Sequence, residues 1–382
     1  MPALGRFLII FTATLAAAAT IGKLVPHIPR LAAQFDISLA AAGFLVSSVM
    51  LPGALAGPLF GALVDRVSPQ RIALFGLALE AAASATLPWA PSAGVFFAIR
   101  LVEGAGFTFV AVAATLIVVE VSSLANRALA LGTFSAFAPL GFALGQLLAA
   151  GMSDRSTAFG HSVVLVAMLA LVAVGMPASK PASVARSSML QVLRFAPALR
   201  TGMAFGCVAG LLLGAVALAP LVIGPAHGLS VQEAARLTAL AAMPGIAGRF
   251  MSGWLLGRSA PLRMFAIAAG IGVLFVPAAL VAPVPLAVAL ACFCVFQICM
   301  GALAGMLSAM LPRVAPSPSQ LGTVTGLANQ MITAGNLLGP PAVLAVFAAA
   351  GTTSAAVLLA VALAFGVWLV SGVPAYRGAS AS

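Results

Sequence analysis

Titratable side chains are scarce in this chain. Of its 382 residues only 7% are charged; seven residues are acidic, three are histidines and one is a tyrosine. They are scattered, and no nucleophile stands in a spacing with a base that is typical of a catalytic triad or a metal centre. The sequence also contains no nucleotide-binding loop. We therefore predict a protein that is not an enzyme and that binds no cofactor and no metal.

Cysteine is rare as well, with four residues in the whole chain. Cys207, Cys292, Cys294 and Cys299 all fall within long apolar stretches. Their spacing matches no metal-binding motif, and a disulfide framework is not expected between helices embedded in lipid. We expect these cysteines to act as small apolar packing residues.

Apolar residues dominate instead. The chain is 63% hydrophobic with a mean hydropathy of +1.18, far above the values of a soluble globular protein. The long apolar runs show no alternation of period two, so they predict helices rather than barrel strands. The expected fold class is an all-α membrane protein with twelve transmembrane helices. These helices are expected over residues 6–25, 39–61, 71–90, 94–119, 127–150, 160–177, 199–223, 232–257, 262–282, 285–310, 319–346 and 352–374.

Membrane topology explains the net charge of +11. Basic residues stand singly at the ends of the apolar runs without accompanying aromatics, so we expect no nucleic-acid partner. With both termini in the cytoplasm, most of the 18 Lys and Arg residues, including Lys180, Arg186 and Arg258, lie on the cytoplasmic side, as the positive-inside rule requires. The predicted location is the cell membrane, with residues 6–25 as a retained first span rather than a cleaved signal.

The sequence divides into two halves. Residues 178–198 are rich in Ser, Pro and Arg and contain no long apolar run, so they separate six predicted spans from six. A shift of 192 positions aligns residues 52–71 with 244–263, where Pro, Gly, Gly, Leu, Arg, Pro and Arg coincide. We predict pseudo-symmetric six-helix halves over 1–178 and 199–382, joined by a cytoplasmic linker over 179–198.

Two motifs carry a resemblance to a known family. The segment "GALVDR" followed by Arg71 resembles the loop signature between the second and third helices of the major facilitator superfamily, Gly-x-Leu-Ala-Asp-Arg-x-Gly-Arg-Arg-Arg. The matching residues are Gly61, Leu63, Asp65, Arg66 and Arg71. The segment "RLVEGAG" resembles the fourth-helix signature of that family, Arg-x-x-Gln-Gly-x-Gly. Here Arg100, Gly104 and Gly106 match, and Glu103 replaces the glutamine.

The resemblance implies a secondary transporter that binds a small molecule and works by alternating access within the lipid bilayer. A third family signature, associated with proton-coupled exporters, is degraded in "SAFAPLGFALGQ", since Ala138 precedes Pro139 where a glycine is usual. This departure weakens the case for drug export. Short loops and the lack of a further domain favour a monomer.

A glycine pattern precedes the first motif. Gly53, Gly57 and Gly61 recur every four residues, which lets another helix approach closely. Asp65 follows at the cytoplasmic edge, where its carboxylate can hold the positive N-terminal end of a helix such as the eleventh. We therefore predict that Asp65 takes part in a latch that closes the cytoplasmic side.

The resemblance implies further members of this latch, because the family uses this loop as one. Gly61, Arg66 and Arg71 belong to the loop motif itself, and Glu120 and Arg127 at the end of the fourth helix can complete a charge network with it. A role as topology anchors alone explains Arg66 and Arg71 equally well.

Cations inside apolar spans are costly, so they indicate pairing or function. Arg249 lies nine residues before Arg258, hence about 13 Å along the eighth span and near the membrane centre, and the C-terminal spans place no carboxylate beside it. Its partner is either a carboxylate of the N-terminal half or the substrate. Lys23, in the outer half of the first span, is either a second substrate contact or a lysine that reaches the membrane interface.

Three further charges belong to the third and fourth spans. If this hairpin turns near residue 92, Glu80 lies at the depth of Gly104 and within reach of Arg100, so we predict a Glu80–Arg100 ion pair. Glu103 then remains as the expected proton-binding group, because a low-dielectric site favours its neutral form. The predicted proton-coupling residues are Glu103, Glu80 and Arg100.

A basic residue in each half suits a small organic anion. We expect a proton-coupled secondary transporter for a carboxylate-type anion, with Arg249 and Lys23 binding the substrate and Gln297 and Asn329 as further contacts. Interhelical hydrogen bonding explains the last two residues equally well. The alternative function is proton-driven export of drugs or lipophilic metabolites.

Overall fold

A computed structural model describes residues 3–176, 189–256, 261–281 and 283–377. Lys180, Arg186, Arg258 and the first part of the predicted linker lie outside the described residues. Within these ranges the chain consists of α-helices and short 3-10 helices, without a strand. The predicted all-α membrane fold class is confirmed.

Ten helical segments of the described chain are long and apolar enough to cross a membrane. Two features explain why this number is ten and not the twelve that were predicted. The eighth predicted span is broken at Met243 and Pro244 into α12 (Val231–Ala242) and α13 (Gly245–Leu255), each too short to cross alone. The last two spans lie in one run, α16 (Leu321–Ser371), interrupted by the non-helical Gly351 at φ 77°, a conformation that favours glycine. The exact count of twelve stays a prediction.

The chain forms two compact units. Unit 1 comprises Met1–Ser123, Ala136–Val192 and Pro316–Gln330, and unit 2 comprises Leu124–Ser135, Leu193–Ala315 and Met331–Ser382. The first residues of α16 thus belong to unit 1 and the remainder to unit 2. The predicted division into halves at 179–198 stays a prediction.

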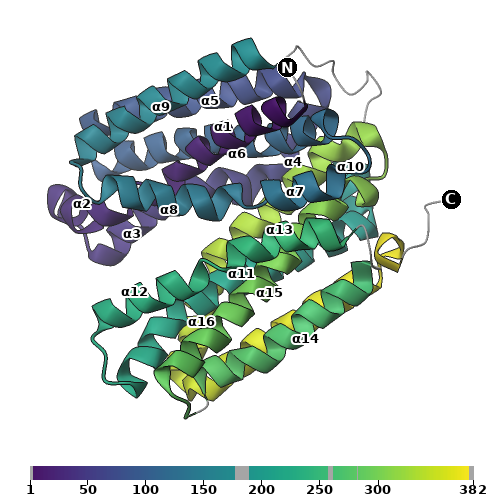
Figure 1. Ribbon diagram of the computed structural model, residues 1–382. Helices are drawn as coiled ribbons and strands as arrows, with labels where there is room; N and C mark the ends of the chain where they lie inside the picture. Colours follow the sequence, from purple (N-terminus) through teal and green to yellow (C-terminus); the bar gives the residue numbers. More distant parts are fainter. Residues whose placement is uncertain (1–2, 177–188, 257–260, 282, 378–382) are drawn as a thin grey trace. The chain divides into compact units, whose positions relative to one another are not determined.

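Unit 1 is a bundle of long helices. Its elements are α1 (Ala3–Gly22), η1 (Val25–His27), α2 (Ile28–Phe35), α3 (Leu39–Ser47), η2 (Ser48–Met50), α4 (Leu51–Arg66), α5 (Pro69–Thr86), η3 (Leu87–Trp89), α6 (Ala93–Val121), α8 (Phe137–Ala149), α9 (Asp154–Gly175), the start of α10 (Met189–Arg194), η4 (Pro318–Gln320) and the start of α16. Figure 1 shows α1, α5, α6 and α9 side by side, and α1 and α5 each contact both α6 and α9. Side chains on these four helices therefore meet inside the bundle.

Local sequence explains where two of these helices begin and how closely they pack. The hydroxyl of Ser68 caps α5, directly before Pro69 at the first helical position, and Ser92 caps α6. Gly106 on α6 faces α5 without a side chain: a Cβ there would lie 2.8 Å from the backbone nitrogen of Glu80 and 2.8 Å from the carbonyl oxygen of Gly76. The two backbones consequently approach each other beside Glu80.

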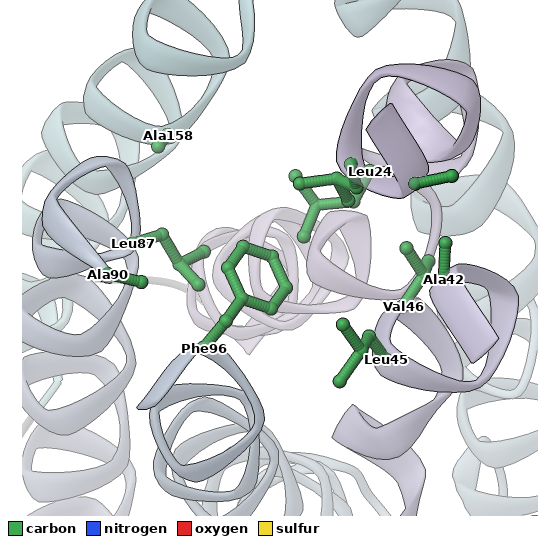
Figure 2. Close-up of a cluster of buried hydrophobic side chains, with 10 residues drawn as sticks. Leu24, Ala42, Leu45, Val46, Leu87, Ala90, Phe96 and Ala158 are labelled. Atoms are coloured by element: carbon green, nitrogen blue, oxygen red, sulfur yellow. The ribbon is translucent and has the colours of Figure 1, made fainter. Parts of the chain in front are cut away.

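An apolar cluster closes one end of this bundle. Figure 2 shows its side chains converging from several helices. Some members of this cluster border a group of charged side chains that is described in the next subsection. We call these members the apolar cap; they are Leu24, Val46, Leu87, Phe96 and Ala158, each at most 4% exposed. Because these side chains offer no polar group to water, they exclude solvent from the bundle at this end.

Unit 2 is also helical in its described residues. Its elements are α7 (Arg127–Phe134), α11 (Ala196–Ala226), α12, α13, α14 (Pro261–Leu280), α15 (Leu286–Val314), the later part of α16 and η5 (Pro374–Arg377). Helix α15 contacts α11, α13 and α14, and α13 also contacts α7. Gly248 permits the close packing of α13 on α15, since a Cβ there would overlap the carbonyl of Ile298.

Candidate functional site

The ammonium of Lys23 lies inside unit 1. The residue directly follows α1 and is only 2% exposed. Its Nζ donates hydrogen bonds to Ser84 Oγ (2.6 Å), to His161 Nδ1 (2.9 Å) and to the carboxylate of Glu103, with which it forms an ion pair. All three of its N–H groups therefore have acceptors. The hypothesis that Lys23 reaches the membrane interface is wrong, and the carboxylate beside it removes the reason for expecting a substrate anion there.

Glu103 bridges two cations. One of its carboxylate oxygens accepts from Lys23 and the other from Arg100, one turn earlier on α6. Arg100 is fully buried and donates further hydrogen bonds to the carbonyl oxygens of Thr20 (3.2 Å) and Val46 (2.7 Å). The guanidinium thus links α6 to α1 and α3.

Glu80 does not pair with Arg100, so that prediction is wrong. Glu80 is fully buried on α5, and neither of its carboxyl oxygens has a hydrogen-bond partner in the described part of the chain. The predicted depth was correct to within two residues, because Glu80 lies against Gly106 rather than Gly104. Arg100 instead takes Glu103, its neighbour three positions along the same helix. The two glutamates have exchanged their expected roles: Glu103 is paired and Glu80 is not.

His161 on α9 completes this group, and sequence reasoning missed it. Its Nε2 lies 2.9 Å from the carbonyl oxygen of Ala16, and its Nδ1 lies 2.9 Å from Lys23 Nζ. Since the carbonyl can only accept, Nε2 carries the proton and Nδ1 accepts from the ammonium. The available signal was an ionisable side chain within the predicted span 160–177. We call Lys23, Glu80, Arg100, Glu103 and His161 the ion cluster.

Asp65 holds the beginning of α16. Its Oδ1 accepts from the backbone amide of Gly322 (2.6 Å), and its Oδ2 accepts from the backbone amide (2.8 Å) and the hydroxyl (2.6 Å) of Thr323. These amides are unpaired donors of the first helical turn, where the helix dipole also favours a negative charge. The expected contact between Asp65 and the N-terminus of the eleventh predicted helix is therefore present.

The glycines of α4 make this contact possible. A Cβ at Gly57 would overlap the carbonyl oxygen of Gly326, and one at Gly61 would overlap that of Gly322. The backbones of α4 and of the first turns of α16 are therefore in direct contact, and Asp65, one turn beyond Gly61, reaches the amides.

The other expected members of the latch form no ion pair within the part of the chain that the structure describes. Arg66 and Arg71 are exposed at the end of α4 and the start of α5, and no salt bridge to either is found among the described residues. Glu120 is exposed near the end of α6 in unit 1, whereas Arg127 begins α7 in unit 2. Their joint role stays a prediction.

Arg249 is a half-buried cation on α13 of unit 2. Its Nη1 donates to the carbonyl oxygen of Ser135 (2.9 Å), which follows α7. The single acidic residue in the described part of unit 2, Glu233, forms a capping box with Ser230 at the start of α12. The described part of this unit therefore gives Arg249 a neutral acceptor and no carboxylate.

The two amide residues expected at the site lie in different units. Gln297 on α15 is 1% exposed, and its Oε1 has no partner among the described residues. The backbone carbonyl of Gln297 faces Gly245, one turn before Arg249 on α13. Asn329, on the part of α16 that belongs to unit 1, is half-buried. Arg249 and Gln297 are thus placed on neighbouring helices of unit 2, whereas Lys23 and Asn329 belong to unit 1.

Long apolar helices that enclose a cluster of buried charges in unit 1 and carry a half-buried arginine in unit 2 are typical of a membrane transport protein. The family model of the Major Facilitator Superfamily matches residues 7–340, and the chain belongs to this family. The protein is therefore a multi-pass membrane transporter and not an enzyme, as predicted from its sequence.

Solved structures share this fold over nearly the whole chain. The human organic anion transporter MFSD10 (TETRAN) has a TM-score of 0.78 at 18% identity, covering 97% of this chain and 100% of that one. The family member FucP, in its outward conformation, has a TM-score of 0.73 at 20% identity, with 96% and 97% covered. The proton:xylose symporter XylE has a TM-score of 0.74 at 14% identity, with 97% and 96% covered. Such low identities show the fold alone.

Relatives found by sequence match shorter segments. "Multidrug resistance protein 2" of Bacillus subtilis (strain 168) is 24% identical over 139 residues, which are 36% of this chain and 35% of the relative. The uncharacterized MFS-type transporter YbcL of the same organism is 28% identical over 149 residues, 38% of either chain. The matched segments thus span little more than a third of these relatives.

Proposed function

We propose that this protein is a secondary transporter that moves a small organic anion of the carboxylate type across the cell membrane, coupled to protons and working by alternating access. Arg249 carries the proposal. A guanidinium inside a membrane span is costly unless an anion or a water-filled cavity compensates it. The carbonyl of Ser135 satisfies one of its donors but supplies no negative charge, so a substrate carboxylate is the partner that this site requires.

The chemistry of the Arg249 side chain suits a carboxylate. An arginine can bind both carboxylate oxygens through two parallel hydrogen bonds. Gln297, on the neighbouring helix α15, has a side-chain oxygen that no donor in the described chain satisfies, which suits a hydroxyl or protonated group on the same substrate. Lys23 is no longer part of this proposed site, since Glu103 neutralises it.

The fold neighbours are compatible with this proposal. MFSD10 is an organic anion transporter and XylE is a proton symporter. The ion cluster of unit 1, remote in sequence from Arg249, provides titratable groups for proton coupling. We further propose that Asp65 acts as a conformational latch, because breaking its three hydrogen bonds to the start of α16 would free that helix. A monomer with both termini in the cytoplasm completes the proposal.

Transport assays in proteoliposomes test the substrate class. Radiolabelled small carboxylates and a cationic dye would be compared with and without a pH gradient for the wild type, Arg249→Gln and Arg249→Lys. We expect carboxylate flux that depends on the gradient. Arg249→Gln should lower it about tenfold or more, since a hydrogen bond to a charged group contributes about 1.5–3 kcal/mol. Arg249→Lys should retain part of the flux because it keeps the charge but not the bidentate geometry.

A matched control is Arg263→Gln, because Arg263 is an exposed arginine in the first turn of α14 in the same unit. The carboxylate flux of this variant should equal that of the wild type.

The alternative function is export of drugs or lipophilic metabolites, which the similarity to Multidrug resistance protein 2 favours. Dye transport without carboxylate flux, unchanged in Arg249→Gln, would establish that alternative and overturn the anion site.

A further inference from the structure

The ion cluster is arranged in layers below the apolar cap. Leu24 follows Lys23 in the chain, the carbonyl of Val46 accepts from Arg100, and the carbonyl of Ala158 accepts from Ser84. The cap seen in Figure 2 therefore borders the paired members of the cluster directly.

Glu80 lies in the deepest of these layers. Leu87, which begins η3 directly after α5, belongs to the apolar cap, and Ser84, three positions earlier on α5, contacts Lys23. Glu80 stands one turn further, about 10 Å from Leu87 at 1.5 Å per residue. Residues four positions apart lie on the same helix face, so Glu80 and Ser84 both point toward the cluster. Glu80 lies against Gly106, three residues beyond Glu103 on α6, and is thus the member furthest from the sealed end.

Opposing electrostatic effects act on the Glu80 carboxyl. Lys23 and Arg100 are cations and Glu103 is the one carboxylate paired with them, so these three groups carry one surplus positive charge, which favours an ionised Glu80. Burial and the lack of a hydrogen-bond donor in the described chain favour its neutral form. A carboxyl held between two large opposing effects is able to change its protonation state when its surroundings move.

We propose that Glu80, rather than Glu103, is the carboxyl that takes up and releases the coupled proton, an assignment that rests on the proposed proton coupling. Protonated Glu80 leaves the cluster with its surplus positive charge. When Glu80 releases the proton to water, its carboxylate balances that charge and the cluster becomes neutral. Glu103 is a fixed counter-ion, because protonating it would leave both Lys23 and Arg100 without a negative partner.

The groups facing Glu80 define this proton site. Arg100 and Glu103 from α6 and Lys23 from the end of α1 act electrostatically on Glu80, and His161 from α9 lies against Lys23 and Ser84. His161 keeps its Nε2 proton on the carbonyl of Ala16, so it acts as an acceptor for Lys23 and not as the carrier. The apolar cap blocks water on one side, hence the proton exchanges from the opposite side when α5 and its neighbours separate.

Infrared difference spectroscopy tests the assignment without any substrate. The purified full-length protein in lipid would be titrated above about pH 6, where exposed carboxyls remain ionised. The carbonyl-stretch band of protonated carboxylic acids would be recorded for the wild type, Glu80→Gln, Glu80→Asp and Glu233→Gln. We expect a pH-dependent band that Glu80→Gln abolishes, that Glu80→Asp shifts in frequency, and that Glu233→Gln leaves unchanged. Glu233 is the control because it is an exposed helix-capping glutamate.

Each contrary result overturns the assignment. The absence of a titrating band in the wild type would do so, as would a band that persists in Glu80→Gln. Should Glu80→Gln fail to fold, Glu80→Asp decides by the same spectrum: an unshifted band excludes Glu80 as its source.

A second measurement separates this inference from the proposed function. Vesicles would be loaded with the transported carboxylate, and exchange would be compared with accumulation driven by a pH gradient. We expect Glu80→Gln to keep exchange, which needs no net proton movement, and to lose accumulation. Accumulation equal to that of the wild type would overturn the assignment. If no carboxylate is transported by any variant, the proposed substrate class fails while the infrared result still decides the proton site.

Discussion

Oδ2 of Asp65 accepts two hydrogen bonds from Thr323, one from its backbone amide at 2.8 Å and one from its hydroxyl at 2.6 Å, although the two residues are 258 positions apart. Asp65 is 2% exposed, so water does not compete for these bonds. The first turn of α16 is thereby capped by a residue of α4 rather than by its own N-terminal side chains. The stability of this turn consequently depends on the contact between the two helices.

Substitutions that remove hydrogen bonds between Asp65 and the start of α16 should weaken this helix contact, each in proportion to the bonds lost. Asp65→Asn removes the charge and should cost about 1.5–3 kcal/mol, whereas Thr323→Val removes only the hydroxyl bond and should cost about 0.5–1.5 kcal/mol. The melting temperature of the purified protein in detergent measures both. The control is Asp36→Asn, since Asp36 is an exposed residue in the left-handed conformation that asparagine tolerates. Equal melting temperatures for Asp65→Asn and Asp36→Asn would contradict a structural role of the hydrogen bonds that Asp65 accepts from the start of α16.

The contact between α4 and α16 should not tolerate a methyl group. Gly57→Ala places a Cβ against the carbonyl of Gly326, so the helices must separate and Asp65 loses its reach to the amides. We expect a lower melting temperature and slower transport. Gly43→Ala is the matched control, because nothing lies within 4 Å of a Cβ at Gly43 on α3 and alanine favours the helix. A Gly57→Ala variant as stable as Gly43→Ala would show that the two backbones are not in contact.

The ion pairs of unit 1 predict an asymmetry between two substitutions. Lys23→Met leaves Glu103 paired with Arg100, whereas Glu103→Gln removes the carboxylate that is paired with both buried cations. Removing one partner of a buried pair costs about 3–5 kcal/mol when the remaining charge is uncompensated. Glu103→Gln should therefore lower the melting temperature or the yield of folded protein more than Lys23→Met. The reverse order would mean that Arg100 does not compensate Glu103.

His161 should stabilise unit 1 through Lys23. In His161→Leu the ammonium loses the acceptor at 2.9 Å, and an unsatisfied buried donor costs about 1–3 kcal/mol. We expect a measurable loss of thermal stability, smaller than that of Glu103→Gln because the ion pair remains. His227→Asn serves as the histidine control, since His227 lies at the C-terminal end of α11, in the other unit. A His161→Leu variant as stable as this control would exclude the hydrogen bond to Lys23.

Several features of the site were predictable from short-range patterns. The four-residue spacing of Gly57 and Gly61 indicated a close helix contact, and Asp65 after it indicated a negative charge for a helix N-terminus; both are found. The lone cation at Arg249 also followed from the distribution of seven acidic residues along the chain. These inferences needed only helical periodicity and the cost of charge in lipid.

Pairing within the ion cluster was not predictable in the same way. Counting residues along a hairpin placed Glu80 near its observed depth, but depth does not fix the direction of a side chain. Each residue turns by about 100° around a helix with 3.6 residues per turn, so the rotation of α5 and α6 decides whether Arg100 meets Glu80 or Glu103. Packing at Gly76 and Gly106 sets that rotation.

The sequence by itself determined that the chain is a bundle of membrane-spanning helices with few, isolated charges. This follows because a backbone in lipid must satisfy its hydrogen bonds within each segment, so apolar length alone specifies the element. Only the tertiary structure decided that Glu103 joins Lys23 and Arg100, that His161 belongs to the same cluster, and that Glu80 has no hydrogen-bond partner among the described residues. Those relations depend on contacts between helices far apart in the chain, whose rotations are fixed only when the helices pack against one another.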